Sequence, residues 1–308
     1  MQISFLRQKL IGPMALSFVT GISACSEPTT EQMSAATESS ISDIVTDLAP
    51  AKEVQIRWTD YGIPHIKANS WEGLGYGFAH ASASNTICVL AREFVTVRGE
   101  QAKYFGATDA NINQDAFHRA LLNQNKLEEY LAYGSADSKA MDLGYVRGYN
   151  DYIERHRGRM PASCNNAPWI TQINESDLAR INIGVGIRYG LGRVTNEIAT
   201  SGPGLELAQL QPLDLEVDRN MIGSNALGFG GALTESGRGV LMGNPHYPWH
   251  GPSRFHMAHL TYPGEMDVMG AALITTSRIA IGFTEHVAWS HTVSTALRFT
   301  MFQLDLVP

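Results

Sequence analysis

The hydrophobic pattern of this 308-residue chain changes from helical to strand-like at one place, and this change constrains the fold more than any other feature. Before about residue 200, apolar residues recur at the spacing of an amphipathic helix, most clearly at Met141, Tyr145, Tyr149 and Ile153. After residue 224, short apolar runs alternate with Gly, Pro and Asn, which is typical of antiparallel strands. The sequence therefore predicts an α+β protein, with a helical half followed by an antiparallel β half.

The expected elements follow from these two periods. The first half carries one strand at residues 53–58 and four helices, over 71–97, 115–131, 141–154 and 175–193. The second half carries six strands, over 226–229, 240–242, 255–262, 266–274, 279–283 and 287–293.

The first 25 residues form an export signal. Two cations precede an apolar run at residues 10–22 that is too short to span a membrane. The run ends in Ile-Ser-Ala-Cys, which resembles the lipobox of bacterial lipoproteins and implies lipidation of Cys25. An ordinary secretory signal cleaved near Ala24 is the alternative. Either interpretation predicts export to the periplasm, with an outer-membrane lipid anchor in the first case.

Charge and composition restrict the kinds of partner that the chain can bind and the structure expected for the residues after the export signal. The formal net charge is −7, from 23 basic and 30 acidic residues, which argues against nucleic acid as a partner. Residues 26–52 are rich in Ser, Thr, Glu and Ala, and we expect a disordered tether there.

If Cys25 is lipidated, Cys88 and Cys164 are the two cysteines that remain. In an oxidising compartment we expect one disulfide between them. Two buried free thiols are the alternative.

The two halves meet at Gly223-Ser224. Residues 201–223 are irregular and acidic, which favours a spacer propeptide between an α chain at 53–200 and a β chain that starts at Ser224. Cleavage after Gly223 would make Ser224 a new N-terminus. An ordinary hairpin turn is the simpler interpretation of a Gly-Ser-Asn triplet.

Three motifs decide between these interpretations, because they occur in one order. They are Gly-Ser-Asn-Ala at 223–226, Asn-Pro-His-Tyr-Pro-Trp at 244–249 and Trp-Ser-His-Thr-Val at 289–293. In this order they resemble the penicillin acylase family of N-terminal-nucleophile hydrolases, and most of all its acyl-homoserine-lactone and aculeacin-type acylases. The likeness extends to residues 61–66 and 98–100 and covers about 53–308. It implies a four-layer αββα core, of which this chain holds part.

The resemblance also implies roles for single residues. Gly223 and Ser224 flank the self-cleavage point, Ser224 is the nucleophile, His246 positions it, and the backbone N–H of Val293 stabilises the oxyanion. Tyr247 matches a position that lines the acyl pocket. A free α-amine has a pKa of about 7.7 to 8.0, so the amine of Ser224 is itself a suitable base. The implied reaction is hydrolysis of a small N-acyl substrate, such as an acyl-homoserine lactone, a β-lactam or a lipopeptide.

Departures from the family pattern limit this interpretation. The family's second oxyanion donor, an asparagine far downstream of the serine, has no counterpart, so we expect an incomplete β chain at 224–308 with little turnover. The calcium site of penicillin G acylases is expected to be absent, because no acid occurs between Glu285 and Asp305. An inactive fragment or a lipid-anchored binding or scaffold module is the alternative function.

A metal site is a further alternative, since His246, His250, His256 and His259 lie close in sequence. Prolines at 245, 248 and 252 exclude a regular helix there. His256 and His259 are three apart on an expected strand and should point to opposite faces. No metal or cofactor is therefore predicted.

Overall fold

The structure is a computed structural model that describes residues 45–49, 52–188, 190–202, 223–294, 299, 300 and 302. These residues belong to one compact unit, 42–308. The expected signal at 1–25 with Cys25, most of the tether and most of the spacer lie outside the described residues. Among the described helices, none is both long and apolar enough to cross a membrane.

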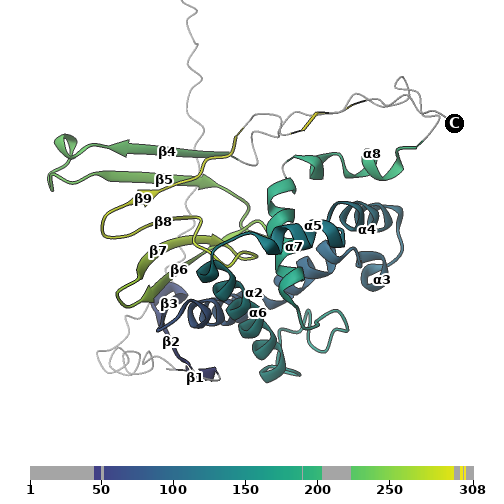
Figure 1. The fold of residues 1–308 in the computed structure, drawn as a ribbon, viewed down its shortest axis with the longest axis horizontal. Helices are drawn as coiled ribbons and strands as arrows, with labels where there is room; N and C mark the ends of the chain where they lie inside the picture. The colour runs from purple at the N-terminus through teal and green to yellow at the C-terminus, as the bar shows by residue number, and fades with distance from the viewer. Residues whose placement is uncertain are drawn as a thin grey trace, which may run out of the picture. The chain divides into compact units, whose positions relative to one another are not determined.

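The elements confirm the α+β class (Figure 1). The helices are α2 (Trp71–Arg98), α3 (Gln101–Phe105), α4 (Asp109–Leu121), α5 (Gln124–Ala132), α6 (Ala136–Arg155), α7 (Glu175–Arg188) and α8 (Thr195–Thr200). Short 3₁₀ turns are η1 (Asp60–Gly62), η2 (Leu191–Arg193) and η4 (Gly231–Leu233). The strands are β1 (Val45–Ala49), β2 (Lys52–Thr59), β3 (Ile63–Ala68), β4 (Gly223–Phe229), β5 (Val240–His246), β6 (Phe255–Tyr262), β7 (Met266–Leu273), β8 (Ile281–Phe283) and β9 (Ala288–Trp289).

Three boundaries differ from the sequence-based expectations. The single helix expected over 115–131 is wrong, because Asn123 interrupts it and its side chain accepts the N–H of Lys126 as the N-cap of α5. The last helix ends at Arg188 instead of residue 193. Within the expected tether at 26–52, residues 45–49 form β1, which pairs antiparallel with β2. Backbone pairing to an open strand edge requires no apolar face, so composition gave no signal for it.

The main sheet mixes the two halves of the chain. Its order is β1-β2-β3-β6-β7-β8-β9, and β3 runs parallel to β6, with Ile66 opposite Leu260. Within the β half every described pair is antiparallel, as expected. The parallel pair joins this half to β3 of the helical half and was not predicted. A parallel neighbour requires a long crossover, and the helical segment between β3 and β6 provides it. Helices cover one face of this sheet, and β4 and β5 form a separate two-stranded sheet. The four-layer αββα arrangement stays a prediction.

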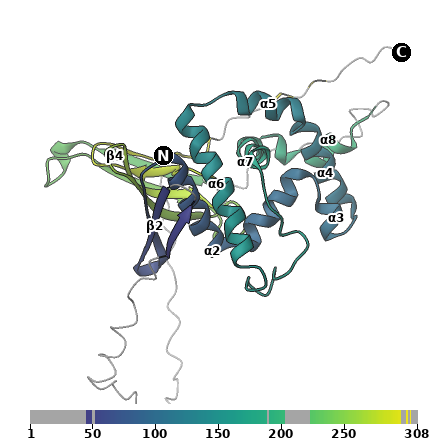
Figure 2. The ribbon, with the colours of Figure 1, turned by 60° about the horizontal axis from the view of Figure 1, so that its bottom comes forward.

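The core centres on α2, which lies between the sheet and α6 (Figure 2). Glycines bring the two helices into backbone contact. A Cβ on Gly75 would lie 1.9 Å from the carbonyl oxygen of Met141, and one on Gly144 would lie 1.9 Å from that of Glu72. The glycines at the start of α2 lower its intrinsic helix propensity. They are required because no side chain fits at this contact.

Arg98 fixes the end of α2 against α7. Gly99 ends the helix in the left-handed region, with φ of 68°. The Arg98 guanidinium donates to both carboxylate oxygens of Asp177 and to Thr171 Oγ1 at 2.7 Å. The Arg-Gly-Glu segment of the sequence resemblance is thus part of the scaffold in this structure.

A disulfide joins Cys88 on α2 to Cys164 in the loop after α6, with a Cα–Cα distance of 5.5 Å. It is the pair expected from the sequence, and the alternative of two free thiols is not what the structure contains. The bond closes a loop across 76 positions of the chain.

We expect the double variant Cys88→Ser/Cys164→Ser to lose about 2 to 4 kcal/mol of unfolding free energy, because the unfolded chain regains the freedom of this loop. Denaturant unfolding of the variant beside the parent chain measures the loss, with Cys25→Ser as the control that leaves the bond intact. Alkylation of Cys88 and Cys164 without prior reduction would contradict the disulfide.

His256 is a titratable group inside the contact between β6 and α2. Its ring packs at 5.1 Å from that of Phe78, and its Nε2 lies 3.4 Å from Ser82 Oγ. Its Nδ1 is buried and has no hydrogen-bond partner among the described residues. Burial, and secondly the positive charge of Arg254, lower the pKa of His256 to about 4.

This pKa predicts a loss of stability in acid. In the unfolded state His256 binds a proton near pH 6.5, whereas in the folded state it does so only near pH 4. The contribution of the buried neutral ring to the free energy of unfolding is therefore complete above pH 6.5 and is lost as the pH falls to 4. The loss is on the order of 3 kcal/mol. Denaturant midpoints between pH 7 and 4 should show it, and His256→Phe should flatten the profile. The exposed His286→Gln is the control, and an unchanged profile in His256→Phe would refute the assignment.

Candidate functional site at the start of β4

The β4–β5 hairpin places the two most informative motifs side by side. Its register sets Gly223 opposite His246 and Ser224 opposite Pro245. Gly223-Ser224-Asn225 is therefore the beginning of a strand, and the alternative of an ordinary hairpin turn is wrong. The actual turn lies between the strands, where Thr234 Oγ1 donates to the carbonyl of Arg238 at 2.6 Å.

The Ser224 hydroxyl contacts the peptide group between Gly223 and Ser224. Its Oγ donates to the carbonyl oxygen of Gly223, in a very short contact. A hydroxyl in this position is next to the carbonyl carbon that it would attack in a self-cleavage. Ser224 and Gly223 are both half-buried.

The imidazole of His246 lies against Gly223. A Cβ on Gly223 would lie 3.2 Å from Nδ1 of His246, so glycine at this position allows the close approach of the ring. The other ring nitrogen, Nε2, contacts two amide nitrogens: Nδ2 of Asn225 at 3.3 Å and Nδ2 of Asn244 at 3.1 Å.

Asn225 and Asn244 were not predicted as site residues. They are a cross-strand pair of the hairpin, which is why both reach the same nitrogen. The signal was present in the sequence, because each asparagine belongs to one of the two quoted motifs. Only the register of β4 on β5 shows that they meet.

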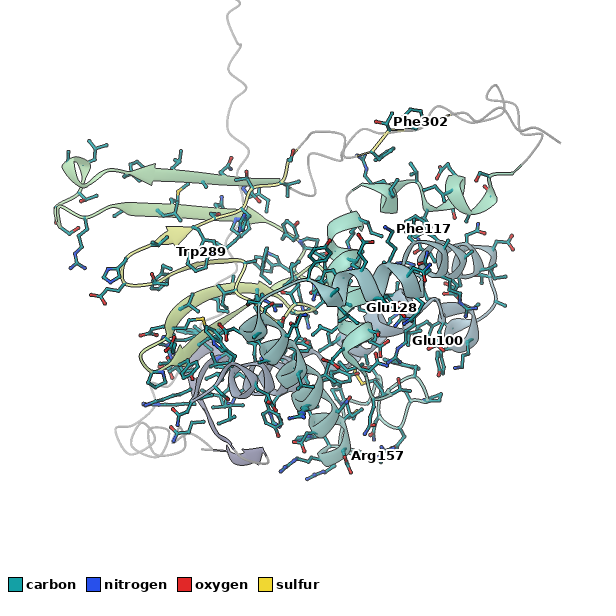
Figure 3. The ribbon with its side chains drawn as sticks, viewed as in Figure 1. Glu100, Phe117, Glu128, Arg157, Trp289 and Phe302 are labelled. Carbon is teal, nitrogen blue, oxygen red and sulfur yellow. A yellow bond between two sulfur atoms is a disulfide. The ribbon has the colours of Figure 1, made fainter. Side chains whose placement is uncertain are left out.

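The third motif lies beside the second. Trp289 lies on β9 (Figure 3). It donates its Nε1–H to the carbonyl of Ala280 at 2.9 Å and so anchors the segment that follows. Ser290 reaches β5, since a Cβ on Gly243 would lie 3.2 Å from its Oγ. Val293 is half-buried further along this segment. In the described part of the chain, no hydrogen bond joins Val293 to Ser224, and the role of Val293 stays a prediction.

A cavity of about 400 Å³ adjoins the end of β5. Its walls are Pro245, Tyr247, Pro248, Trp249, Arg254 and Phe255. The ring of Tyr247 packs at 5.0 Å from that of Phe255. Two prolines and three aromatic rings line the cavity together with one cation, Arg254, and it begins at Pro245, the cross-strand partner of Ser224. It could hold an acyl chain close to the serine.

The neighbouring histidines do not converge. His256 faces α2, whereas His259 Nδ1 lies 2.8 Å from His65 Nδ1, and its Nε2 lies 2.5 Å from Asp267 Oδ1. The prediction that His256 and His259 point to opposite faces is confirmed. Within the described ranges, no three His, Cys, Asp or Glu side chains are placed to hold a metal ion.

Comparison with known sequences defines the class of protein. The sequence model of the penicillin amidase family matches residues 53–308. The chain belongs to this family.

Its relatives are named acylases. The chain is 37% identical over 278 residues to the acyl-homoserine lactone acylase PvdQ of Pseudomonas putida, an alignment that covers 84% of this chain and 36% of that protein. It is also 37% identical over 277 residues to the aculeacin-A acylase of Actinoplanes utahensis, covering 82% of this chain and 35% of the relative. The chain thus spans little more than a third of the length of these relatives.

Proposed function

We propose that this chain is the precursor of an amide hydrolase that cuts itself between Gly223 and Ser224 and then uses Ser224 as an N-terminal nucleophile. The observation that carries the proposal is the position of the Ser224 hydroxyl on the Gly223 carbonyl, with His246 beside it. Membership of the penicillin amidase family supports it.

The self-cleavage is an N-to-O acyl shift followed by hydrolysis. Ser224 Oγ attacks the Gly223 carbonyl carbon, an oxygen–carbon bond forms, and the peptide C–N bond breaks. The hydroxyl proton passes to the departing nitrogen, which becomes the α-amine of Ser224. Water then cleaves the ester and leaves the carboxylate of Gly223. The products are an α chain and a β chain from one precursor.

The mature reaction uses the group that cleavage creates. The free α-amine takes the proton of the Ser224 hydroxyl as it attacks the acyl carbon of the substrate. The backbone N–H of Val293 is proposed to stabilise the oxyanion, where losing one donor costs about 100- to 1000-fold. The amine of the substrate leaves, and water releases the acid.

We propose a small N-acyl substrate whose acyl chain enters the cavity at Tyr247. The proline and aromatic side chains in the walls of that cavity, and the names of the relatives, favour an acyl-homoserine lactone or a lipopeptide. The disulfide between Cys88 and Cys164 supports the expected export to the periplasm, since such bonds persist in oxidising compartments. Lipidation of Cys25 would add a membrane anchor.

The intact mass of the expressed protein tests whether Ser224 is the nucleophile of the self-cleavage. We expect the expressed protein to yield a chain that starts at Ser224, and we expect Ser224→Ala to stay uncut, because alanine has no hydroxyl to attack Gly223. Ser236→Ala, in the turn of the same hairpin, should be cut like the parent chain. An uncut parent would favour the binding or scaffold module instead.

A matched pair of glycine variants tests the contact between Gly223 and His246. Gly223→Ala puts a Cβ 3.2 Å from Nδ1 of His246, whereas Gly228→Ala on the same strand meets nothing within 4 Å. Displacement of the imidazole should slow self-cleavage roughly tenfold, as measured by the rate at which the Ser224 chain appears. Equal rates in the two variants would show that the contact is dispensable.

A further inference from the structure

We infer that Asn225 and Asn244 fix the tautomer of His246, so that this histidine presents an N–H beside the Gly223–Ser224 bond and is not a base. The inference rests on the proposed function and specifies how the site works. Both asparagines act through His246 and are positioning residues.

The first step is the chemistry at Nε2. Two side-chain amide nitrogens lie within hydrogen-bond distance of this atom, at 3.3 and 3.1 Å. Amide nitrogens only donate, so Nε2 must accept with its lone pair. If Nε2 carried the proton, its N–H would point at the N–H groups of the two asparagines, and none of these three groups would have an acceptor there. Neutral His246 therefore carries its proton on Nδ1.

The second step is the position of Nδ1. This atom has no hydrogen-bond partner among the described residues, and it faces Gly223, the residue whose carbonyl is attacked. The asparagines thus hold the ring at Nε2, and the opposite edge of the ring presents the Nδ1–H to Gly223. During the acyl shift the Ser224 hydroxyl proton passes to the Ser224 nitrogen, and His246 keeps its own proton.

The consequence is a division of roles. A histidine that is protonated on Nδ1 and hydrogen-bonded at Nε2 has no free lone pair for the serine. The α-amine released at Ser224 is then the group that accepts the hydroxyl proton in the mature enzyme. The asparagines thus favour the N-terminal amine over a serine–histidine pair.

Nitrogen NMR of the histidine rings tests the tautomer directly. The uncut Ser224→Ala chain is labelled with ¹⁵N-histidine, and the His246 signals are those that vanish in His246→Gln. On the alkaline side of the histidine titration, we expect the pattern of a ring protonated on Nδ1. The isosteric variants Asn225→Asp and Asn244→Asp each place a carboxylate at Nε2, and we expect them to move the proton to that nitrogen. Asn165→Asp, at an exposed site away from the hairpin, should leave the pattern unchanged.

The same aspartate variants are then made in the chain that retains Ser224. We expect self-cleavage to slow roughly a hundredfold, as for loss of one oxyanion donor. Unchanged signals of the other histidines show that each variant is folded. A His246 ring protonated on Nε2 in the parent chain would overturn the inference, and so would full-speed cleavage after the tautomer has switched. An uncut parent with the expected tautomer would instead refute the proposed function alone.

Discussion

The site depends on the backbone pairing of β4 with β5. This pairing sets Gly223 opposite His246 and Asn225 opposite Asn244. The two members of each pair lie about twenty positions apart in the sequence, and the pairing makes them neighbours. A slip of one residue would turn every side chain of the strand to the other face. It would also remove Asn225 from Nε2 of His246 and the imidazole from the serine, whereas Asn244, on the same strand as His246, would stay beside the ring. The hairpin register, more than any single side chain, therefore determines what chemistry is available at Ser224.

The helical half supplies a rigid base for the main sheet. Three glycines, at 75, 144 and 148, let α2 and α6 meet backbone to backbone, and α2 carries the apolar face that covers the strands. Arg98 and the disulfide tie the end and the middle of α2 to the segment after α6. These contacts lie on one side of the sheet, and the hairpin with Ser224 is attached through the neighbouring strands β5 and β9.

Much of this arrangement was predictable from local patterns. The change of period predicts α2, α6 and α7 and all six later strands, whereas α3 and α8 were not expected. The ordered motifs single out Gly223, Ser224 and His246, which the hairpin brings together. The parallel pair of β3 and β6 was not predictable, because two short apolar runs 190 or more positions apart carry no signal of their partnership. Asn225 and Asn244 were missed for a related reason: each is an ordinary polar residue until the register brings both to one ring nitrogen. The break at Asn123 depended on a side-chain cap, which competes with helix continuation in any polar stretch.

The parallel pair has a consequence for the fate of the two chains after a cut at Gly223. His65, Ile66 and Lys67 on one side of the cut pair with His259, Leu260 and Thr261 on the other. The strands that would come from different products thus share one hydrogen-bonded sheet, in which β1, β2 and β3 of the first product meet β6 to β9 of the second at the β3–β6 pair. The disulfide lies wholly within the first product and contributes nothing to this union. Separating the products would require breaking a sheet through its middle, so a protein cut at Gly223 would remain one folding unit whose two pieces could not exchange freely with those of other molecules.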